Sequence, residues 1–223
     1  MLFLLLSLAS AEELPEYVAL LPEVPASHTT VRKRVYEVHL ANPTTLYCGC
    51  TYTDKTPDLK SCGLGDQSGF RWDRTEVEHV VPAAALGTDR PCWEEGGRDH
   101  CIQVDPIYKV AHSDLHNLWP SIGGINNARS AKAMGLLAGE ERLYGTCDFE
   151  VNEEMDRVEP RPEVRGDIAR IYFYMEWMYG LQISEGQRRL LLHWHQTDPV
   201  DEWERTRDAR IKALQGNSNP FVH

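Results

Sequence analysis

The sequence has no apolar run long enough to cross a membrane, no internal repeat and no low-complexity block. A membrane-spanning helix needs about 20 consecutive apolar residues, and the run Leu2–Leu8 is much shorter. Hydrophobic residues make up 42% of the chain and charged residues 26%, which is ordinary globular composition. These features exclude a multi-span membrane protein, a disordered tail protein and a collagen-like fibre.

An excess of positive charge is also lacking. Lys and Arg total 23 against 34 Asp and Glu, so the net charge is −11. This balance excludes a uniformly basic nucleic-acid coat, but it leaves room for a local basic patch because net charge does not say where the charges lie. The length of 223 residues favours one large domain over two small ones.

Familiar zinc motifs are missing, since the chain contains neither HExxH nor CxxC. His193 and His195 form an HxH pair, but the two rings would alternate on a strand or lie about 100° apart per residue on a helix. A core or surface role suits that pair better than a metal site. A metal-dependent hydrolase of another substrate, such as a protease, stays open as an alternative function.

The N-terminus has the pattern of an export signal. An apolar stretch precedes Ala9-Ser10-Ala11, a small-x-small pattern that predicts cleavage before Glu12. We therefore expect a signal peptide at 1–11, an acidic, proline-broken segment at 12–30 and the functional domain at 31–223. The expected location is periplasmic or secreted, and the mature protein is expected to be a monomer without a membrane anchor.

The six cysteines fit an exported protein, because an even count in such a chain indicates disulfides. Cys48 and Cys50 would point to opposite faces of an extended segment, which favours two separate partners over one metal. Six cysteines allow many pairings. Our working hypothesis is Cys48–Cys147 across the core with Cys50–Cys62 and Cys92–Cys101 as local links, and a zinc cluster is the alternative.

Local patterns predict an α+β fold, mostly helical, with a few short strands. In the first two thirds we expect a helix Val31–His39 capped by Thr30, a strand Thr75–Val81, a charged loop Gly87–Cys101, a strand Leu115–Trp119 ended by Pro120 and a helix Ile125–Leu137. The last third is predicted to be helical, with a stop at Gly180, a capping box Ser184–Gln187, a helix start at Asp198-Pro199 and an end at Gly216.

Three polar clusters could carry chemistry. Glu78-His79 pairs a carboxylate, which suits a hard cation such as Mg²⁺, with an imidazole, which suits proton removal from water. The clusters 114–120 and 123–130 follow, and Asn126 and Arg129 lie at the start of the predicted helix. The order of strand, loop, strand and helix can bring His79, Glu78 and Asn126 together around one metal and one phosphate.

Here the resemblance to a known family becomes specific. The segments RWDRTEVEHVVPAAALG, CWEEGGRDHC and AHSDLHNLWPSIGGINNARS strongly resemble the endonuclease I family, and the likeness covers roughly residues 30–222. It implies an exported bacterial DNA and RNA endonuclease with a ββα-metal (His-Me finger) core. It further implies little sequence preference, products with 5′-phosphates and a grip on the nucleic-acid backbone.

The resemblance also assigns residue roles. It implies that His79 is the general base, that Glu78 and Asn126 hold a single divalent metal, and that Arg98 contacts the cleaved phosphate. Mg²⁺ is the expected ion, with Mn²⁺ or Ca²⁺ as alternatives. Five cations near the motif are candidates for the grip on the backbone: Arg71, Arg74, Arg98, Arg129 and Lys132.

The chain departs from the family pattern in two ways. The resemblance implies a further cysteine pair near the C-terminus, but no cysteine follows Cys147 and Arg205 stands in that segment. Family nucleases often look basic, whereas this chain is acidic, so fewer phosphate contacts should flatten the salt dependence of binding. A catalytically inactive, disulfide-rich binding module is a second alternative, and the intact set of Glu78, His79 and Asn126 argues against it.

Overall fold

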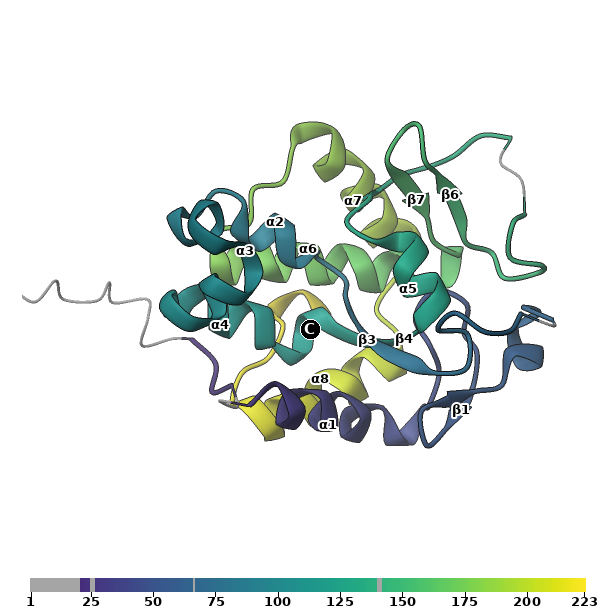
Figure 1. Cartoon of the computed structure of the whole chain (residues 1–223), viewed down its shortest axis with the longest axis horizontal. Coiled ribbons are helices and arrows are strands. Elements are labelled where there is room, and N and C mark those ends of the chain that lie inside the picture. The colour runs from purple at the N-terminus through teal and green to yellow at the C-terminus, as the bar shows by residue number, and fades with distance from the viewer. Residues whose placement is uncertain (1–20, 25–26, 66, 140–141) are drawn as a thin grey trace, which may run out of the picture.

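The computed structural model describes residues 21–24, 27–65, 67–139 and 142–223 (Figure 1). The predicted signal peptide 1–11 and most of segment 12–30 lie outside these residues. The described part is an α+β domain, as predicted. It has eight α-helices, three small sheets and three disulfides.

The centre of the domain is an antiparallel pair of strands followed by a helix. Strand β3 (Thr75–His79) pairs with β4 (Leu118–Ile122), and α5 (Gly123–Arg129) begins directly after β4. The long connection between the strands holds α2 (Ala83–Gly87), α3 (Pro91–Val104) and α4 (Pro106–Ser113). These three helices lie together at one end of the molecule in Figure 1.

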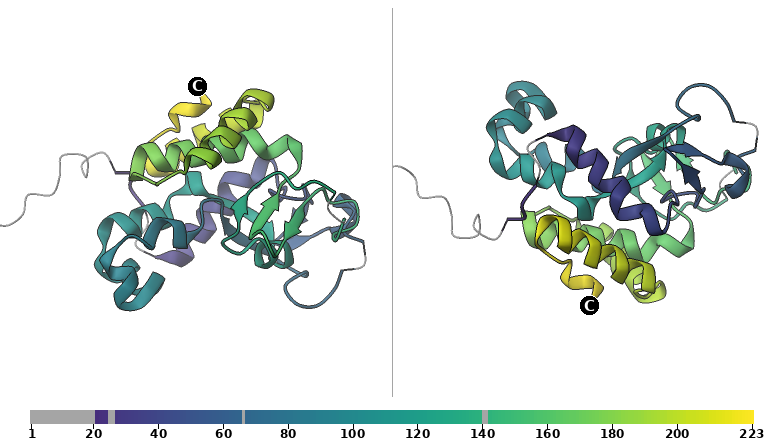
Figure 2. Two further views of the ribbon diagram at one scale, coloured as in Figure 1. Left: turned by 90° about the horizontal axis from the view of Figure 1, so that it is seen from above. Right: turned by 90° about the horizontal axis from the view of Figure 1, so that it is seen from below.

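The remaining elements surround this centre. Helices α6 (Arg165–Tyr179), α7 (Glu185–Thr197) and α8 (Glu202–Gln215) form a layer on one side, as both views of Figure 2 show. Helix α1 (His28–Val38) contacts both α8 and β4. The small sheets at the other end contain β1 (Tyr52–Thr53), β2 (Thr56–Pro57), β5 (Ala133–Met134), β6 (Glu150–Asn152) and β7 (Arg157–Glu159).

The core is built mainly on α6, which is buried nearly all round its first three turns. Ile168, Ile171 and Met175 have almost no exposed surface. Arg170 is also buried and is paired with Glu204 of α8 at 2.6 Å, which satisfies both charges inside the domain. Helix α6 ends at Tyr179, and Gly180, the predicted stop, follows as a left-handed C-cap with a φ of 71°.

The three disulfides join Cys48 to Cys147, Cys50 to Cys62 and Cys92 to Cys101. These are the pairs of the working hypothesis. The first links segments that are 99 residues apart in the chain, whereas the third closes a local loop within α3. None of the described residues forms a zinc-type cluster of three or more His, Cys, Asp or Glu side chains.

Several predicted boundaries are wrong. Helix α1 begins at His28 after Ser27, so Thr30 lies inside it rather than capping it. Strand β3 ends at His79, two residues earlier than predicted. Pro120 lies within β4 instead of ending it, because β4 pairs only with β3 and a strand at a sheet edge tolerates a residue without an N–H.

Two other segments take a different structure. Residues 87–101 were predicted as a loop, but Pro91 at the first helical turn starts α3, which is kinked at Gly96 and Gly97. Helix α5 ends at Arg129 rather than Leu137, because Ser130 has a φ of 50° and β5 then pairs with β7.

At the C-terminus, α8 begins at Glu202 instead of following Asp198. Asp201 and Glu204 form a reciprocal capping box there, whereas Asp198 accepts a hydrogen bond from the Gly166 N–H. The helix ends at Gly216 as predicted. At the start of α7, Ser184 accepts from the Gln187 N–H, which is one half of the predicted capping box.

Candidate active site

The candidate site consists of two adjoining hollows that share residues of β3 in their walls. The α1-side hollow has a volume of about 670 Å³ and includes His28, Arg32, Glu76 and His112. The α5-side hollow has a volume of about 550 Å³ and includes Glu78, Asn127 and Arg129. Five residues line both hollows and form the boundary between them: Arg71, Val77, His79, Arg98 and Asn126.

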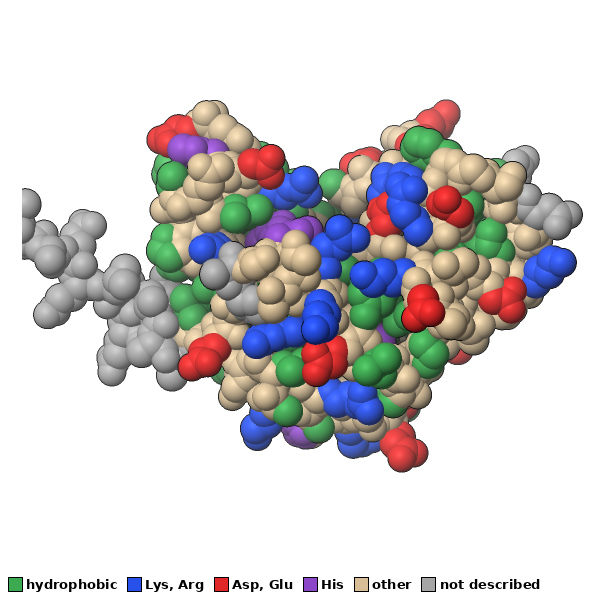
Figure 3. Space-filling view, turned by 60° about the horizontal axis from the view of Figure 1, so that its bottom comes forward, with side chains coloured by type: hydrophobic (Ala, Val, Ile, Leu, Met, Phe, Trp, Pro, Cys, Tyr) green, Lys and Arg blue, Asp and Glu red, His purple; other side chains and the backbone are tan. Residues whose placement is uncertain are grey.

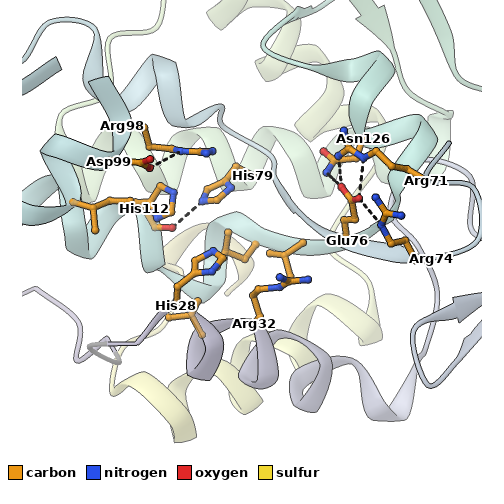
Figure 4. Close-up of a pocket in the computed structure, with 14 residues that line it drawn as sticks. His28, Arg32, Arg71, Arg74, Glu76, His79, Arg98, Asp99, His112 and Asn126 are labelled. Atoms are coloured by element: carbon orange, nitrogen blue, oxygen red, sulfur yellow. Dashed lines mark hydrogen bonds and ion pairs between the residues drawn. The ribbon is translucent and has the colours of Figure 1, made fainter. Parts of the chain in front are cut away.

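His79 ends strand β3 and lies at this boundary. Its Nε2 is 2.8 Å from the backbone carbonyl oxygen of His112 (Figure 4). A carbonyl oxygen only accepts hydrogen bonds, so Nε2 carries the proton of the neutral ring and Nδ1 keeps a lone pair. Burial, reinforced by the charge of Arg98, lowers the pKa of His79 to about 4. The ring is therefore neutral at neutral pH and can accept a proton.

Glu78 precedes His79 and is almost fully buried, with 3% of its surface exposed. Its Oε1 accepts a hydrogen bond from the Tyr47 hydroxyl at 2.7 Å and lies 3.5 Å from Nε of Arg129. Burial raises the pKa of this carboxyl, while Arg129 and Tyr47 act in the opposite direction. The carboxylate is thus held in one orientation at the wall of the α5-side hollow.

Asn126 reaches the site from α5. Its Nδ2 donates to Oε2 of Glu76 at 3.2 Å, so the amide nitrogen is already used (Figure 4). The amide oxygen makes no hydrogen bond with another described residue and is the atom left for a ligand. Asn126 and Glu78 line the same hollow, although they are 48 positions apart in the sequence.

Glu78 and Asn126 form a donor set that fits a hard divalent cation. A carboxylate oxygen and an amide oxygen are the kind of ligand that Mg²⁺ accepts, and Mg²⁺ keeps several waters when a protein supplies few ligands. The described residues contain no larger cluster of acidic, His or Cys side chains suited to a metal. A cation here would therefore complete its coordination with water and a phosphate oxygen.

Arg98 follows the kink in α3 at Gly96 and Gly97, where Gly97 has a φ of 65°. Its side chain is 57% exposed and lines both hollows, and within the described part of the chain it forms an ion pair only with Asp99, at 3.7 Å from Nε. The Cys92–Cys101 disulfide ties the two parts of α3 together across the kink. The position and exposure of Arg98 suit a group that contacts a phosphate.

Arg129 has a different place from the one expected. It is 1% exposed, and its guanidinium donates to the backbone carbonyls of His79 and Val80. It therefore braces the strand that carries Glu78 and His79 rather than facing solvent for a phosphate. Arg129 is the last residue of α5, where its side chain lies against the end of β3, and the sequence alone does not reveal this burial.

Lys132 also departs from the expectation of a nucleic-acid contact. Its ammonium group donates to the Ala128 carbonyl and pairs with Glu153, each at 3.1 Å, and the residue is largely buried. Lys132 lines neither hollow. Its charge is used to join α5 to the turn before β7.

The sequence reasoning missed four residues that shape the site: Tyr47, Glu76, His112 and Arg32. Glu76 could have been found, because it stands two positions before Glu78 on the same strand and so shares its face. It accepts hydrogen bonds from Arg71, Arg74 and Asn126. Tyr47 and Arg32 carry no local signal, since each reaches the site only through the fold, whereas His112 lies in the segment AHSDLHNLWPSIGGINNARS.

Comparison with known proteins places this geometry in a family context. Residues 26–223 match the family described as Endonuclease I. The chain is similar to a periplasmic deoxyribonuclease of Aeromonas hydrophila, with 40% identity over 198 residues that cover 86% of this chain and 83% of that protein. It is also similar to an extracellular deoxyribonuclease of Aeromonas hydrophila, with 37% identity over 217 residues, covering 92% and 94% of the two chains. A third relative is Endonuclease-1 of Buchnera aphidicola, with 40% identity over 192 residues, covering 84% of this chain and 76% of that one.

Proposed function

This chain belongs to the endonuclease I family, and from that premise we propose that it hydrolyses internal phosphodiester bonds of DNA, and also of RNA, through His79 acting as general base. One observation carries the proposal: Glu78, His79, Arg98 and Asn126, from three separate segments, line the same hollow. A base, two oxygen ligands and an exposed cation are the groups that metal-assisted phosphodiester hydrolysis requires.

His79 supplies the proton acceptor. Nδ1 of the neutral ring takes a proton from water, and the resulting hydroxide attacks phosphorus in line with the 3′ oxygen that leaves. The product then carries a 5′-phosphate. General-base catalysis of this kind contributes about 10²–10⁴ in rate.

Glu78 and Asn126 would hold one divalent ion, Mg²⁺ in the first instance, with Mn²⁺ and Ca²⁺ as alternatives. When bound, such an ion neutralises charge that develops on the phosphate and on the leaving oxygen. Arg98 adds a guanidinium that can bind two phosphate oxygens at once. Tyr47 and Arg129 keep the Glu78 carboxylate in place.

Little sequence preference follows from these contacts. Each of the proposed groups addresses the phosphate, which every nucleotide shares, and phosphate contacts position a protein without reading the bases. The proposed step also needs no group that distinguishes ribose from deoxyribose, so we include RNA among the substrates.

The names of the relatives and the disulfides of this chain both support an exported location. Relatives are named as periplasmic or extracellular deoxyribonucleases, and three disulfides suit an oxidising compartment. No described helix has the length and apolar character needed to cross a membrane.

A plasmid-cleavage assay tests the proposal. The purified protein should nick and linearise supercoiled plasmid with Mg²⁺, and EDTA should abolish cleavage. His79→Ala should lower the rate about 10³-fold while circular dichroism and DNA binding stay unchanged. Near-normal nicking by His79→Ala would overturn the base assignment. Absence of cleavage by the parent protein with each metal would favour the inactive binding module, and cleavage of peptides alone would favour another hydrolase.

A further inference from the structure

The two hollows meet at the proposed catalytic groups. His79, Arg98 and Asn126 line both hollows, so a phosphate held by them has open space on either side. The α1-side hollow alone has a volume of about 670 Å³, which is in the range of sites that hold whole small molecules. A nucleic-acid strand cleaved at the boundary must therefore place its neighbouring nucleotides in these hollows.

The far wall of the α1-side hollow comes from helix α1, more than 40 positions before the catalytic motif. His28 points from this helix toward His79 and His112 in Figure 4, and Arg32 extends from the same helix into the hollow. Arg32 is exposed and makes no hydrogen bond or ion pair with another described residue. Arg71 and Arg74, in contrast, share the carboxylate of Glu76.

The charge of this hollow is positive in spite of the acidic chain. Arg32, Arg71, Arg74 and Arg98 line it against two carboxylates, Glu76 and Asp99. Burial, followed by the charges of Arg32 and Arg98, lowers the pKa of His28. Lys and Arg side chains gather near the middle of the face drawn in Figure 3.

We propose that Arg32 forms a second phosphate site, which binds the backbone phosphate of a nucleotide next to the cleaved bond. The assignment rests on the proposed nuclease function. It follows from the geometry, because Arg32 is a cation without a countercharge among the described residues and lines the space into which the strand must continue. Arg32 does not touch the cleaved phosphate in this arrangement, so it contributes to binding rather than to the chemical step.

The test measures DNA binding against salt in a protein that cannot cleave. His79→Ala serves as the parent, and its affinity for a fluorescein-labelled duplex is followed by anisotropy across NaCl concentrations. Arg32→Ala in this parent should raise Kd about five- to tenfold at low salt and reduce the slope of log Kd against log salt by about 0.9. Lys33→Ala is the matched control, because Lys33 is the exposed neighbour on the same helix and lines neither hollow.

A second measurement separates binding from chemistry. With His79 intact, Arg32→Gln should raise KM for duplex DNA and leave kcat within about twofold of the parent value. Equal Kd and equal salt slopes for Arg32→Ala and Lys33→Ala would overturn the assignment of Arg32, as would a loss confined to kcat. Failure of the His79→Ala parent to bind DNA would instead overturn the proposed function, so the two failures are distinguishable.

Discussion

The imidazole of His79 and the main chain of His112 are joined by a hydrogen bond of 2.8 Å from Nε2 to the carbonyl oxygen. Because the partner is a backbone atom, this contact fixes the tautomer of His79 whatever side chain stands at position 112. Nδ1 is left as the proton acceptor. The pH dependence of proton removal should therefore reflect the surroundings of the His79 ring.

The pH dependence of cleavage should therefore have an unusually low midpoint. Burial, together with the charge of Arg98, lowers the pKa of His79 from 6.5 to about 4, and only the neutral ring can act as base. We expect kcat/KM to rise as pH increases through about 4 and to be flat from about pH 6 to pH 8. Initial rates on a fluorescent oligonucleotide at fixed Mg²⁺ measure this profile, and His193→Ala, an exposed histidine outside the site, should leave it unchanged. A midpoint near 6.5 would show that the pKa of the catalytic base is not lowered by burial in the folded protein.

Glu78→Gln should affect both the metal and the fold. The substitution removes the charge that we propose to bind a cation, and it leaves the buried guanidinium of Arg129 without its partner at 3.5 Å. Breaking a buried ion pair costs about 3–5 kcal/mol of unfolding free energy. We expect weaker Mg²⁺ binding by isothermal titration calorimetry and a lower midpoint in urea unfolding.

Tyr47→Phe provides the control for Glu78→Gln. It removes the hydrogen bond of 2.7 Å to Glu78 but keeps both buried charges. We expect a loss of about 2 kcal/mol in stability, because the bond is made to a charged group, and Mg²⁺ affinity close to that of the parent. If Glu78→Gln bound Mg²⁺ as tightly as Tyr47→Phe does, Glu78 would not be a metal ligand.

The order of strand, strand and helix could be predicted from the sequence, because the local patterns that mark these elements lie in that order along the chain. Glu78, His79 and Asn126 line one hollow, as this order allows, and their roles stay predictions. Element boundaries were harder to predict. Pro120 lies within an edge strand rather than ending it, and Pro91 starts a helix rather than marking a loop. Tertiary packing decided these cases.

Burial of charged side chains could not be predicted at all. Arg129 and Lys132 follow Asn126 in a polar segment and look like surface cations, yet both are buried and paired within the protein. Arg32 shows the reverse case, since it stands far from the motif in the sequence and reaches the hollow only because α1 packs against β4. Which cation faces the substrate is a property of the fold.

Removing each of two disulfides should lower the unfolding free energy by a different amount. Loop-closure entropy grows with the number of residues enclosed, and Cys48–Cys147 spans 99 residues whereas Cys92–Cys101 spans 9. Replacing the first pair with serine should cost about 4–5 kcal/mol in unfolding free energy and replacing the second about 2–3 kcal/mol. Denaturant unfolding of the two double variants measures the difference.

The loss of DNA cleavage should be larger when Cys92–Cys101 is removed than when Cys48–Cys147 is removed, which is the reverse of the order for stability. Cys92–Cys101 encloses the kink that presents Arg98, so its loss should lower DNA cleavage in protein that is still folded. The Cys48–Cys147 variant should keep its specific activity at temperatures where it remains folded. Equal specific activities for the two folded variants would show that the disulfide in α3 does not position Arg98.

His39 should make the protein sensitive to mild acid. It is 1% exposed between the rings of Trp119 and Trp203, its Nδ1 bonds to the Val35 carbonyl, and its Nε2 has no partner in the described structure. Burial, reinforced by Arg207, lowers its pKa from 6.5 to about 3. The stabilising effect of the neutral ring is complete above about pH 6.5 and is lost as pH falls toward about 3, because the unfolded chain binds the proton first.

Replacement of His39 by phenylalanine isolates this contribution. One proton gives a slope of about 1.4 kcal/mol per pH unit, so the loss of unfolding free energy between about pH 7 and pH 5 should be about 2 kcal/mol smaller in His39→Phe than in the parent. Urea unfolding at the two pH values measures it, with His193→Ala as the exposed control that keeps the parent difference. If the unfolding free energy of His39→Phe fell with pH as much as that of the parent, the protonation of His39 would not contribute to the acid sensitivity of the fold. Because each protein is compared with itself at the two pH values, a loss of stability that comes only from altered packing is the same at both and does not change the difference.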